Sequence, residues 1–191
     1  KAITEASATK GIAIGYDTKA KATDSVAIGP KALTEESATK GIAIGDSAIA
    51  SGVDATAIGQ SAQASGYSLA AGSNAHALGT ASIALGYNAL SSSENSVAIG
   101  KGAQALPWRT ISIGQDAGKG QVTDVILDKN EHINIGVKAG ENIDGQVNIS
   151  IGQSAGSNTV GKGNIALGQN AGRNTGGTDS SVGNNIAIGT N

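Results

Sequence analysis

The segment Ile42-Ala43-Ile44-Gly45 decides the fold, because versions of it recur from one end of the 191-residue chain to the other. Each version has an aliphatic, a small and a second aliphatic residue before a glycine, and successive glycines are mostly 14 or 16 residues apart. A repeat this short can close only one turn of a solenoid. The other copies end at Gly15, Gly29, Gly86, Gly100, Gly114, Gly136, Gly152, Gly168 and Gly189.

Each turn of the solenoid, or coil, is expected to contain two short strands, because glycines between Gly45 and Gly86 also recur at half the spacing. Residues one and three before the glycine share a strand face, so we expect the Ile, Val and Leu side chains to point inward. The strand after each glycine carries small inward residues, such as Ala48 and Ala50. We therefore predict an all-β, parallel β-roll of two close sheets, with two short strands in each coil of 14 to 16 residues.

The composition fits a narrow interior and excludes several classes of function. The chain has 29 Gly, one Trp and no Phe, Met or Cys, whereas a compact globule anchors its core with aromatic residues. Its 13 basic and 15 acidic residues form no basic stripe, which disfavours nucleic-acid binding. Without cysteine there are no disulfides and no thiolate metal sites. No apolar run reaches the roughly 18 residues that span a bilayer.

Turn chemistry divides the chain into two zones of what we expect to be one continuous solenoid. Residues 1–114 form tight coils. Residues 115–191 continue the roll with an Ala-Gly pair soon after each aliphatic strand and with polar loops at 119–132 and 173–185. Insertions in a solenoid map to loops, commonly on one face. Because the chain begins and ends within the repeat, we expect it to be a piece of a longer protein.

No constellation of residues predicts catalysis or a cofactor. The two histidines, His76 and His132, belong to different coils, so no triad or paired-ligand spacing exists. Hexapeptide-repeat acyltransferases offer an enzymatic alternative, but their unit has six residues and the unit here has seven. Four oxygen-bearing side chains of the longest loop match no EF-hand spacing and indicate a solvated loop rather than a metal site: Asp124, Asp128, Asn130 and Glu131.

The only tryptophan lies in Leu106-Pro107-Trp108-Arg109. Because Pro107 breaks the strand pattern, we expect Trp108 at a turn. An indole at a turn either packs against neighbouring chains or binds a ligand. Trp108 and Arg109 are therefore candidate ligand-binding residues, and packing is the competing interpretation.

The repeats resemble the YadA-like head of trimeric autotransporter adhesins, the surface fibres of Gram-negative bacteria. The SVAIG repeat of that family is present at Ser25-Val26-Ala27-Ile28-Gly29, and a second copy precedes Ala103 and Ala105. The resemblance implies a left-handed parallel β-roll, assembled as a homotrimer. It implies a non-catalytic head that binds extracellular matrix proteins such as collagen, or other cell-surface ligands. It also implies a place on the cell surface, anchored in the outer membrane through a C-terminal region outside this sequence.

The resemblance supplies one candidate ligand-binding motif. In the family, NSVAIG segments are tied to collagen binding. Since we expect Val97 and Ile99 in the core, Asn95, Ser96 and Ala98 would face the ligand. Two other functions remain open: a segment of a trimeric phage tail fibre, whose loop-bearing repeats look similar, and an ice-binding solenoid, which would need a regular outward ladder of Thr. The motif is matched residue by residue by Asn95, Ser96, Val97, Ala98, Ile99 and Gly100.

Overall fold

The computed structural model describes residues 3–4, 9–121, 131–174 and 183–190, which belong to two compact units. Unit 1 is Lys1–Ala89 and unit 2 is Leu90–Asn191. Over the described ranges all regular secondary structure is β-strand, with no helix. The prediction of an all-β chain is confirmed for this part of the protein.

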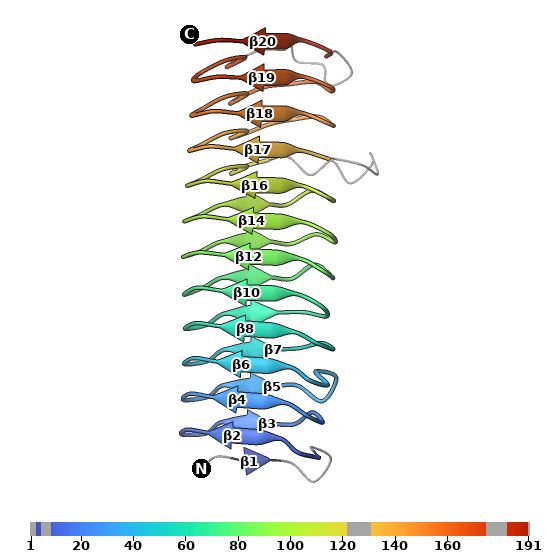
Figure 1. Cartoon of the computed structure of the whole chain (residues 1–191), viewed down its shortest axis with the longest axis vertical. Helices are drawn as coiled ribbons and strands as arrows, with labels where there is room; N and C mark the ends of the chain where they lie inside the picture. Colours follow the sequence, from blue (N-terminus) through green and yellow to red (C-terminus); the bar gives the residue numbers. More distant parts are fainter. Residues whose placement is uncertain (1–2, 5–8, 122–130, 175–182, 191) are drawn as a thin grey trace. The chain divides into compact units, whose positions relative to one another are not determined.

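Unit 1 is a parallel β-solenoid in which each complete coil adds one strand to each of two sheets (Figure 1). We call the sheet of three-residue strands the long-strand sheet and the sheet of two-residue strands the short-strand sheet. In the long-strand sheet the order is β2 (Ile12–Ile14), β4 (Val26–Ile28), β6 (Ile42–Ile44), β8 (Thr56–Ile58), β10 (Leu69–Ala71) and β12 (Ile83–Leu85). In the short-strand sheet the order is β1 (Ile3–Thr4), β3 (Lys19–Ala20), β5 (Leu33–Thr34), β7 (Ile49–Ala50), β9 (Gln63–Ala64) and β11 (His76–Ala77).

Unit 2 has the same plan with fewer short strands. After Gly114 the described part of each coil keeps only the long strand, because an Ala-Gly turn with left-handed backbone at Gly118 takes the place of the short one. The prediction of two strands per coil is confirmed for the tight coils and is wrong for the described residues beyond Gly114. The short strands are β13 (Leu90–Ser91) and β15 (Gln104–Ala105). The long strands run β14 (Val97–Ile99), β16 (Ile111–Ile113), β17 (Ile133–Ile135), β18 (Ile149–Ile151), β19 (Ile165–Leu167) and β20 (Ile186–Ile188).

Each strand pairs with the strand one coil away at the equivalent residue, so equivalent positions stack into ladders. Ala27, for example, lies between Ala13 and Ala43. The turns follow the same register, since the N–H of Gly45 donates to the carbonyl of Ile28 at 2.8 Å. Each coil is therefore held by backbone hydrogen bonds to the coils directly before and after it.

Small residues line the interior of the roll, so the predicted inward direction of the aliphatic side chains is wrong. The middle residues of the long strands are buried, as with Ala27 and Ala43, which have no exposed surface. The inward residues of the short strands, Ala48 and Ala50, are buried as expected. The flanking aliphatic residues point outward, and Ile58 remains 41% exposed. Across the tight coils the two walls meet mainly through alanine methyl groups, and Thr18 and Thr34 are also buried there.

The glycine that ends each long strand is required by the close approach of successive coils. Gly29 has a φ of +121°, a value that L side chains rarely adopt, and a Cβ there would lie 2.6 Å from the carbonyl oxygen of Gly45 in the next coil. A larger residue would have to push the two coils apart. This contact explains why glycine recurs at the end of the long strands.

The coils after Gly114 have a more polar interior, in which a second glycine makes room for larger side chains. Asn134, in the middle of β17, is buried and donates its side-chain amide to Ser112 Oγ at 3.2 Å. Its amide fills the space that a side chain at Gly140 would need. Core volume is therefore kept similar along the stack, since Ala faces Ala in the tight coils while Ser or Asn faces Gly here.

Candidate functional site

The outer face of the long-strand sheet carries two ladders of aliphatic side chains, which we call the aliphatic face. These side chains are exposed to a substantial extent: Ile14 by 57%, Ile111 by 36% and Ile135 by 38%. A contiguous apolar surface on a soluble protein marks an interaction site. In unit 1 the face comprises Ile12, Ile14, Val26, Ile28, Ile42, Ile44, Ile58, Leu69, Ile83 and Leu85, with Thr56 and Ala71 in the remaining places. In unit 2 it comprises Val97, Ile99, Ile111, Ile113, Ile133, Ile135, Ile149, Ile151, Ile165, Leu167, Ile186 and Ile188.

The NSVAIG segment presents only alternate side chains to the outside. Asn95 is exposed and has a left-handed φ of 56° at the turn before β14. Val97 and Ile99 point outward and belong to the aliphatic face. Their predicted place in the core is therefore wrong, for the same reason that holds along every long strand.

The other residues of the segment serve the fold. Ser96 and Ala98 have no exposed surface, and Ser96 Oγ lies 2.6 Å from Ser91 Oγ inside the roll. A Cβ at Gly100 would lie 2.7 Å from the carbonyl carbon of Gly114 in the next coil. The expectation that Ser96 and Ala98 face a ligand is wrong, because strand alternation turns both into the narrow interior.

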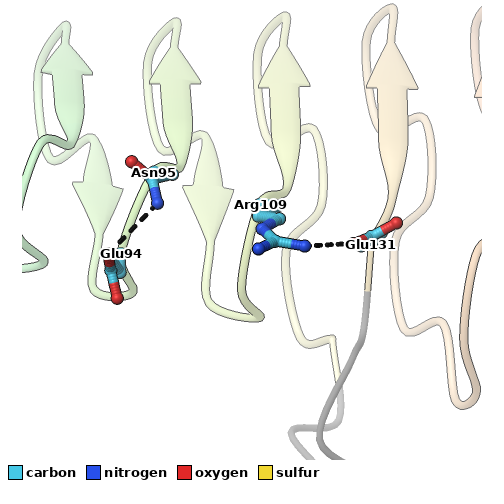
Figure 2. A network of polar contacts seen from close by, with 4 residues as sticks. All are labelled: Glu94, Asn95, Arg109 and Glu131. Atoms are coloured by element: carbon cyan, nitrogen blue, oxygen red, sulfur yellow. Dashed lines mark hydrogen bonds and ion pairs between the residues drawn. The ribbon is translucent and has the colours of Figure 1, made fainter.

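A second candidate surface is formed by the turns that precede the long strands of unit 2 (Figure 2). Trp108 lies at a turn, as predicted, and is 51% exposed. Pairing of β14 with β16 places Asn95 and Arg109 at equivalent positions of successive coils, and the N–H of Arg109 donates to the carbonyl of Glu94 at 3.2 Å. The structure thus brings three sequence-predicted residues together. We call Glu94, Asn95, Trp108, Arg109 and Glu131 the Trp108 edge.

Polar contacts order the side chains of this edge, as Figure 2 shows. Arg109 Nη1 lies 3.0 Å from Glu131 Oε1, and the two side chains are 60% and 41% exposed. Asn95 Nδ2 donates to Glu94 Oε1 at 3.2 Å. An ion pair this exposed contributes up to about 1 kcal/mol to stability. On sequence grounds Glu131 was assigned only to a solvated loop. The signal that could have found it is the repeat, because Glu131 precedes Gly136 by five residues, as Arg109 precedes Gly114.

The interior of unit 2 contains a buried histidine. His132 is 1% exposed, and its Nδ1 accepts a hydrogen bond from the backbone N–H of Asn148 at 3.2 Å. Burial lowers the pKa of His132 from 6.5 to about 4, and the nearby backbone at Gly145 acts in the opposite direction. The sequence indicated only an unpaired histidine at this position, so the inward direction of its side chain was missed.

An asparagine ladder continues the column that His132 begins. The side-chain amide of Asn164 donates to Asn148 Oδ1 at 3.0 Å, and that of Asn185 donates to Asn164 Oδ1 at 2.9 Å. One signal could have revealed the ladder: asparagine stands directly before the aliphatic strand in three successive coils. These contacts stabilise the roll and offer no group to a ligand.

Within the described ranges no three His, Cys, Asp or Glu side chains gather as a metal site would require. His76 lies in unit 1 and His132 in unit 2, and the side chain of His132 is buried in the interior. Three residues weighed as oxygen ligands, Asp124, Asp128 and Asn130, lie outside the described residues. The part of the chain that the structure describes also contains no long apolar helix of the kind that crosses a membrane.

Stacked coils, an aliphatic outer face and an ordered polar edge define a repeat scaffold suited to surface contacts. The family model described as the YadA head domain repeat matches residues 6–32, 37–62, 50–75, 66–89 and 91–117, which together exceed half of the chain. The chain belongs to the YadA head family, as its repeats predicted. This is a family of cell-surface autotransporter adhesins, so the function is of the adhesin type, and the family and its fold are typically non-enzymatic. No curated protein matches the chain.

Proposed function

We propose that the chain forms the head of a homotrimeric surface adhesin that attaches, without catalysis, to extracellular matrix proteins such as collagen or to other cell-surface ligands. Membership of the YadA head family supports this proposal. In the trimer, three left-handed rolls stand side by side. Zones 1–114 and 115–191 form one continuous solenoid, and a C-terminal region outside this sequence anchors the protein in the outer membrane.

The aliphatic face is the observation that best supports a trimer. Its side chains recur at every coil and, as with Ile14 and Ile151, keep 57% and 39% of their surface exposed in the single chain. Burial of apolar surface contributes about 25 cal/mol per Å², so a contact repeated over many coils accumulates a large stabilisation. Two further copies of the chain would cover this face, since a neighbouring roll presents an aliphatic ladder with the same spacing.

Coverage of the aliphatic face leaves the turns and the short-strand sheet for ligands. Val97 and Ile99 would then lie at the trimer contact, and Asn95 would be the NSVAIG side chain that reaches a ligand. Trp108 and Arg109 lie beside it on the next coil. Three copies of each position multiply weak contacts, so that avidity replaces strong binding at a single site.

The test compares Ile99→Asp with Lys101→Asp in the full 191-residue chain. Light scattering should give a trimer mass for the wild type and for Lys101→Asp, because Lys101 is exposed in a turn. Ile99→Asp places a carboxylate in the dry contact and should shift the mass towards the monomer. A monomeric wild type at micromolar concentration would overturn the trimer.

Attachment is measured separately, on surfaces coated with collagen, fibronectin and laminin. The wild type and Lys101→Asp should be retained on at least one coating. Ile99→Asp should be retained much less, because a monomer loses the multiplied contacts. Equal retention of all three proteins would contradict the role of valence, and no retention on any coating or on cells would contradict the adhesin function.

A further inference from the structure

We propose that the Trp108 edge is a binding site for a neutral sugar residue of a surface glycan. This inference rests on the proposed adhesin function and names the chemistry of one ligand. Its first support is Trp108 itself, an indole that remains 51% exposed. The equivalent turn residue one coil earlier is Glu94, so the fold places no demand for an aromatic side chain at this position.

The polar groups beside Trp108 are of the kind that bind sugar hydroxyls. An indole face packs against the C–H groups of a pyranose ring, while planar amide, guanidinium and carboxylate groups exchange hydrogen bonds with hydroxyls that both donate and accept. Asn95 and Arg109 come from adjacent turns, and each is oriented by one carboxylate partner, as Figure 2 shows. The remaining N–H groups of Arg109 and the Oδ1 atom of Asn95 can still bond a ligand.

Orientation before binding lowers the cost of ordering these side chains. Arg109 Nη1 is 3.0 Å from Glu131 Oε1, and Asn95 Nδ2 is 3.2 Å from Glu94 Oε1. Immobilising a long polar side chain on binding costs about 0.5–1.5 kcal/mol, part of which these contacts have already met. The edge is therefore ordered in the unbound protein while its polar atoms stay accessible.

The charge of the edge selects a neutral ligand. Glu94 and Glu131 carry one negative charge each, and Arg109 supplies the single positive charge between them. The sum is a net negative charge at a surface where Arg109 is already paired. A sulfated or carboxylated glycan would be repelled, whereas a neutral hexose or N-acetylhexosamine would not.

A peptide ligand fits this edge less well. Recognition of an extended peptide by strand addition needs an unpaired sheet edge. The strand that follows Trp108, β16, is already paired on both sides, with β14 and β17. The pairing of β16 therefore disfavours a ligand that binds as an extended strand.

The test measures binding of the chain to polyvalent conjugates of glucose, galactose, mannose and N-acetylglucosamine, with heparin and type I collagen in parallel. Trp108→Ala is compared with Tyr87→Ala, a matched control because Tyr87 is also a 51% exposed aromatic residue in a turn. At least one neutral conjugate should bind the wild type and Tyr87→Ala equally. Trp108→Ala should lose about tenfold in affinity at an unchanged melting temperature.

Several results would overturn the site. These are equal sugar binding by Trp108→Ala and Tyr87→Ala, no binding of any neutral conjugate to the wild type, tighter binding of heparin than of the sugars, or sensitivity of collagen binding alone to Trp108→Ala. Failure of the site is distinguishable from failure of the proposed function, since retention on matrix surfaces and the trimer mass are measured independently. Saturation-transfer NMR on the bound conjugate provides a second readout, with the strongest transfer expected at ring C–H protons.

Discussion

His132 couples the interior of unit 2 to pH. Its pKa is about 4 in the folded chain and 6.5, the ordinary value for histidine, in the unfolded chain. Between these values the unfolded chain binds a proton that the folded chain does not, so stability is fully present above pH 6.5 and is lost as pH falls towards 4. The loss should approach about 3 kcal/mol. Urea unfolding across this pH range measures it.

His132→Asn is the matched variant, because asparagine occupies the same column at Asn148 and Asn164. An amide oxygen can accept the bond from the Asn148 N–H and does not titrate. The difference in unfolding free energy between variant and wild type should therefore grow as pH falls from 6.5 to 4. Parallel pH profiles for the two proteins would show that His132 is not the group responsible.

Ala166 leaves an unfilled space in the core, whereas larger residues fill the equivalent space in the neighbouring coils. Asn134 and Ser150 occupy the space beside Gly140 and Gly156, but Ala166 next to Gly172 leaves a cavity of about 10 Å³. Ala166→Ser adds one hydroxyl at this place and should stabilise the protein by about 0.5–1 kcal/mol. The midpoint of urea unfolding should rise while the slope stays unchanged.

Ala70→Ser is the control for this variant. Ala70 is fully buried and packs in the alanine cluster of unit 1, between Ala57 and Ala84. A hydroxyl there gains no cavity and lies among the alanine methyl groups of the cluster, so the same substitution should destabilise. A gain of equal size in both proteins would contradict the cavity explanation.

For single residues, the sequence predicted the place in the backbone better than the contacts of the side chain. Pro107 was sufficient to place Trp108 at a turn, because proline acts through its own backbone. The repeat puts Arg109 and Glu131 at equivalent places, five residues before Gly114 and Gly136, but it does not show whether the two side chains meet. Sequence spacing does not contain that information.

At the scale of the strand, the direction of side chains controls what each residue can tolerate. Ala57 and Thr56 are adjacent in β8, but Ala57 is fully buried while Thr56 lies outward between Ile42 and Leu69. Ala57→Leu should overpack the interior and cost about 3 kcal/mol or more. Thr56→Leu should leave stability unchanged or raise it, because it completes an aliphatic ladder.

Thermal unfolding of these two variants decides the direction of the strand. The same side chain is introduced at neighbouring positions, so differences in composition cannot explain the result. A larger loss from Thr56→Leu than from Ala57→Leu would restore the arrangement with aliphatic residues inside. Equal losses would mean that β8 has no preferred inward face.

The period of the repeat predicted the strands correctly, but the predicted inward face of the strands was wrong. Alternation shows that Ile42 and Ile44 lie on one face of the strand and Ala43 on the other. It does not show which of the two faces points into the roll. The usual rule buries the larger apolar residue. Here alanine lines the interior and the larger aliphatic residues lie outside, and nothing within one sequence marks an aliphatic ladder as outward.

At the scale of the whole chain, the repeat makes the number of coils adjustable. Residues 4–15 and 34–45 are nearly identical and lie two coils apart. Deletion of residues 16–45 therefore joins Gly15 to Asp46 with the same local sequence around the junction, and every remaining strand in unit 1 finds an equivalent partner. The shortened chain should fold with unchanged circular dichroism per residue.

A deletion out of register provides the control. Removal of 23 rather than 30 residues, 16–38, would shift the sequence by half a coil and bring long strands against short ones, so that both sheets are interrupted at the junction. This protein should aggregate or unfold at a lower temperature than the in-register deletion. Similar behaviour of both chains would contradict the ladder register.

The hydrogen bonds that hold one coil only to its neighbours also determine how either unit responds to mechanical tension. A pull on one end loads the outermost coil first, and the coils beneath it keep their bonds until it has peeled away. Each detached coil of 14 to 16 residues should lengthen the chain by about 50 Å. An attached cell pulled by flow would therefore lose its hold in small steps, each of which dissipates energy, instead of in one rupture.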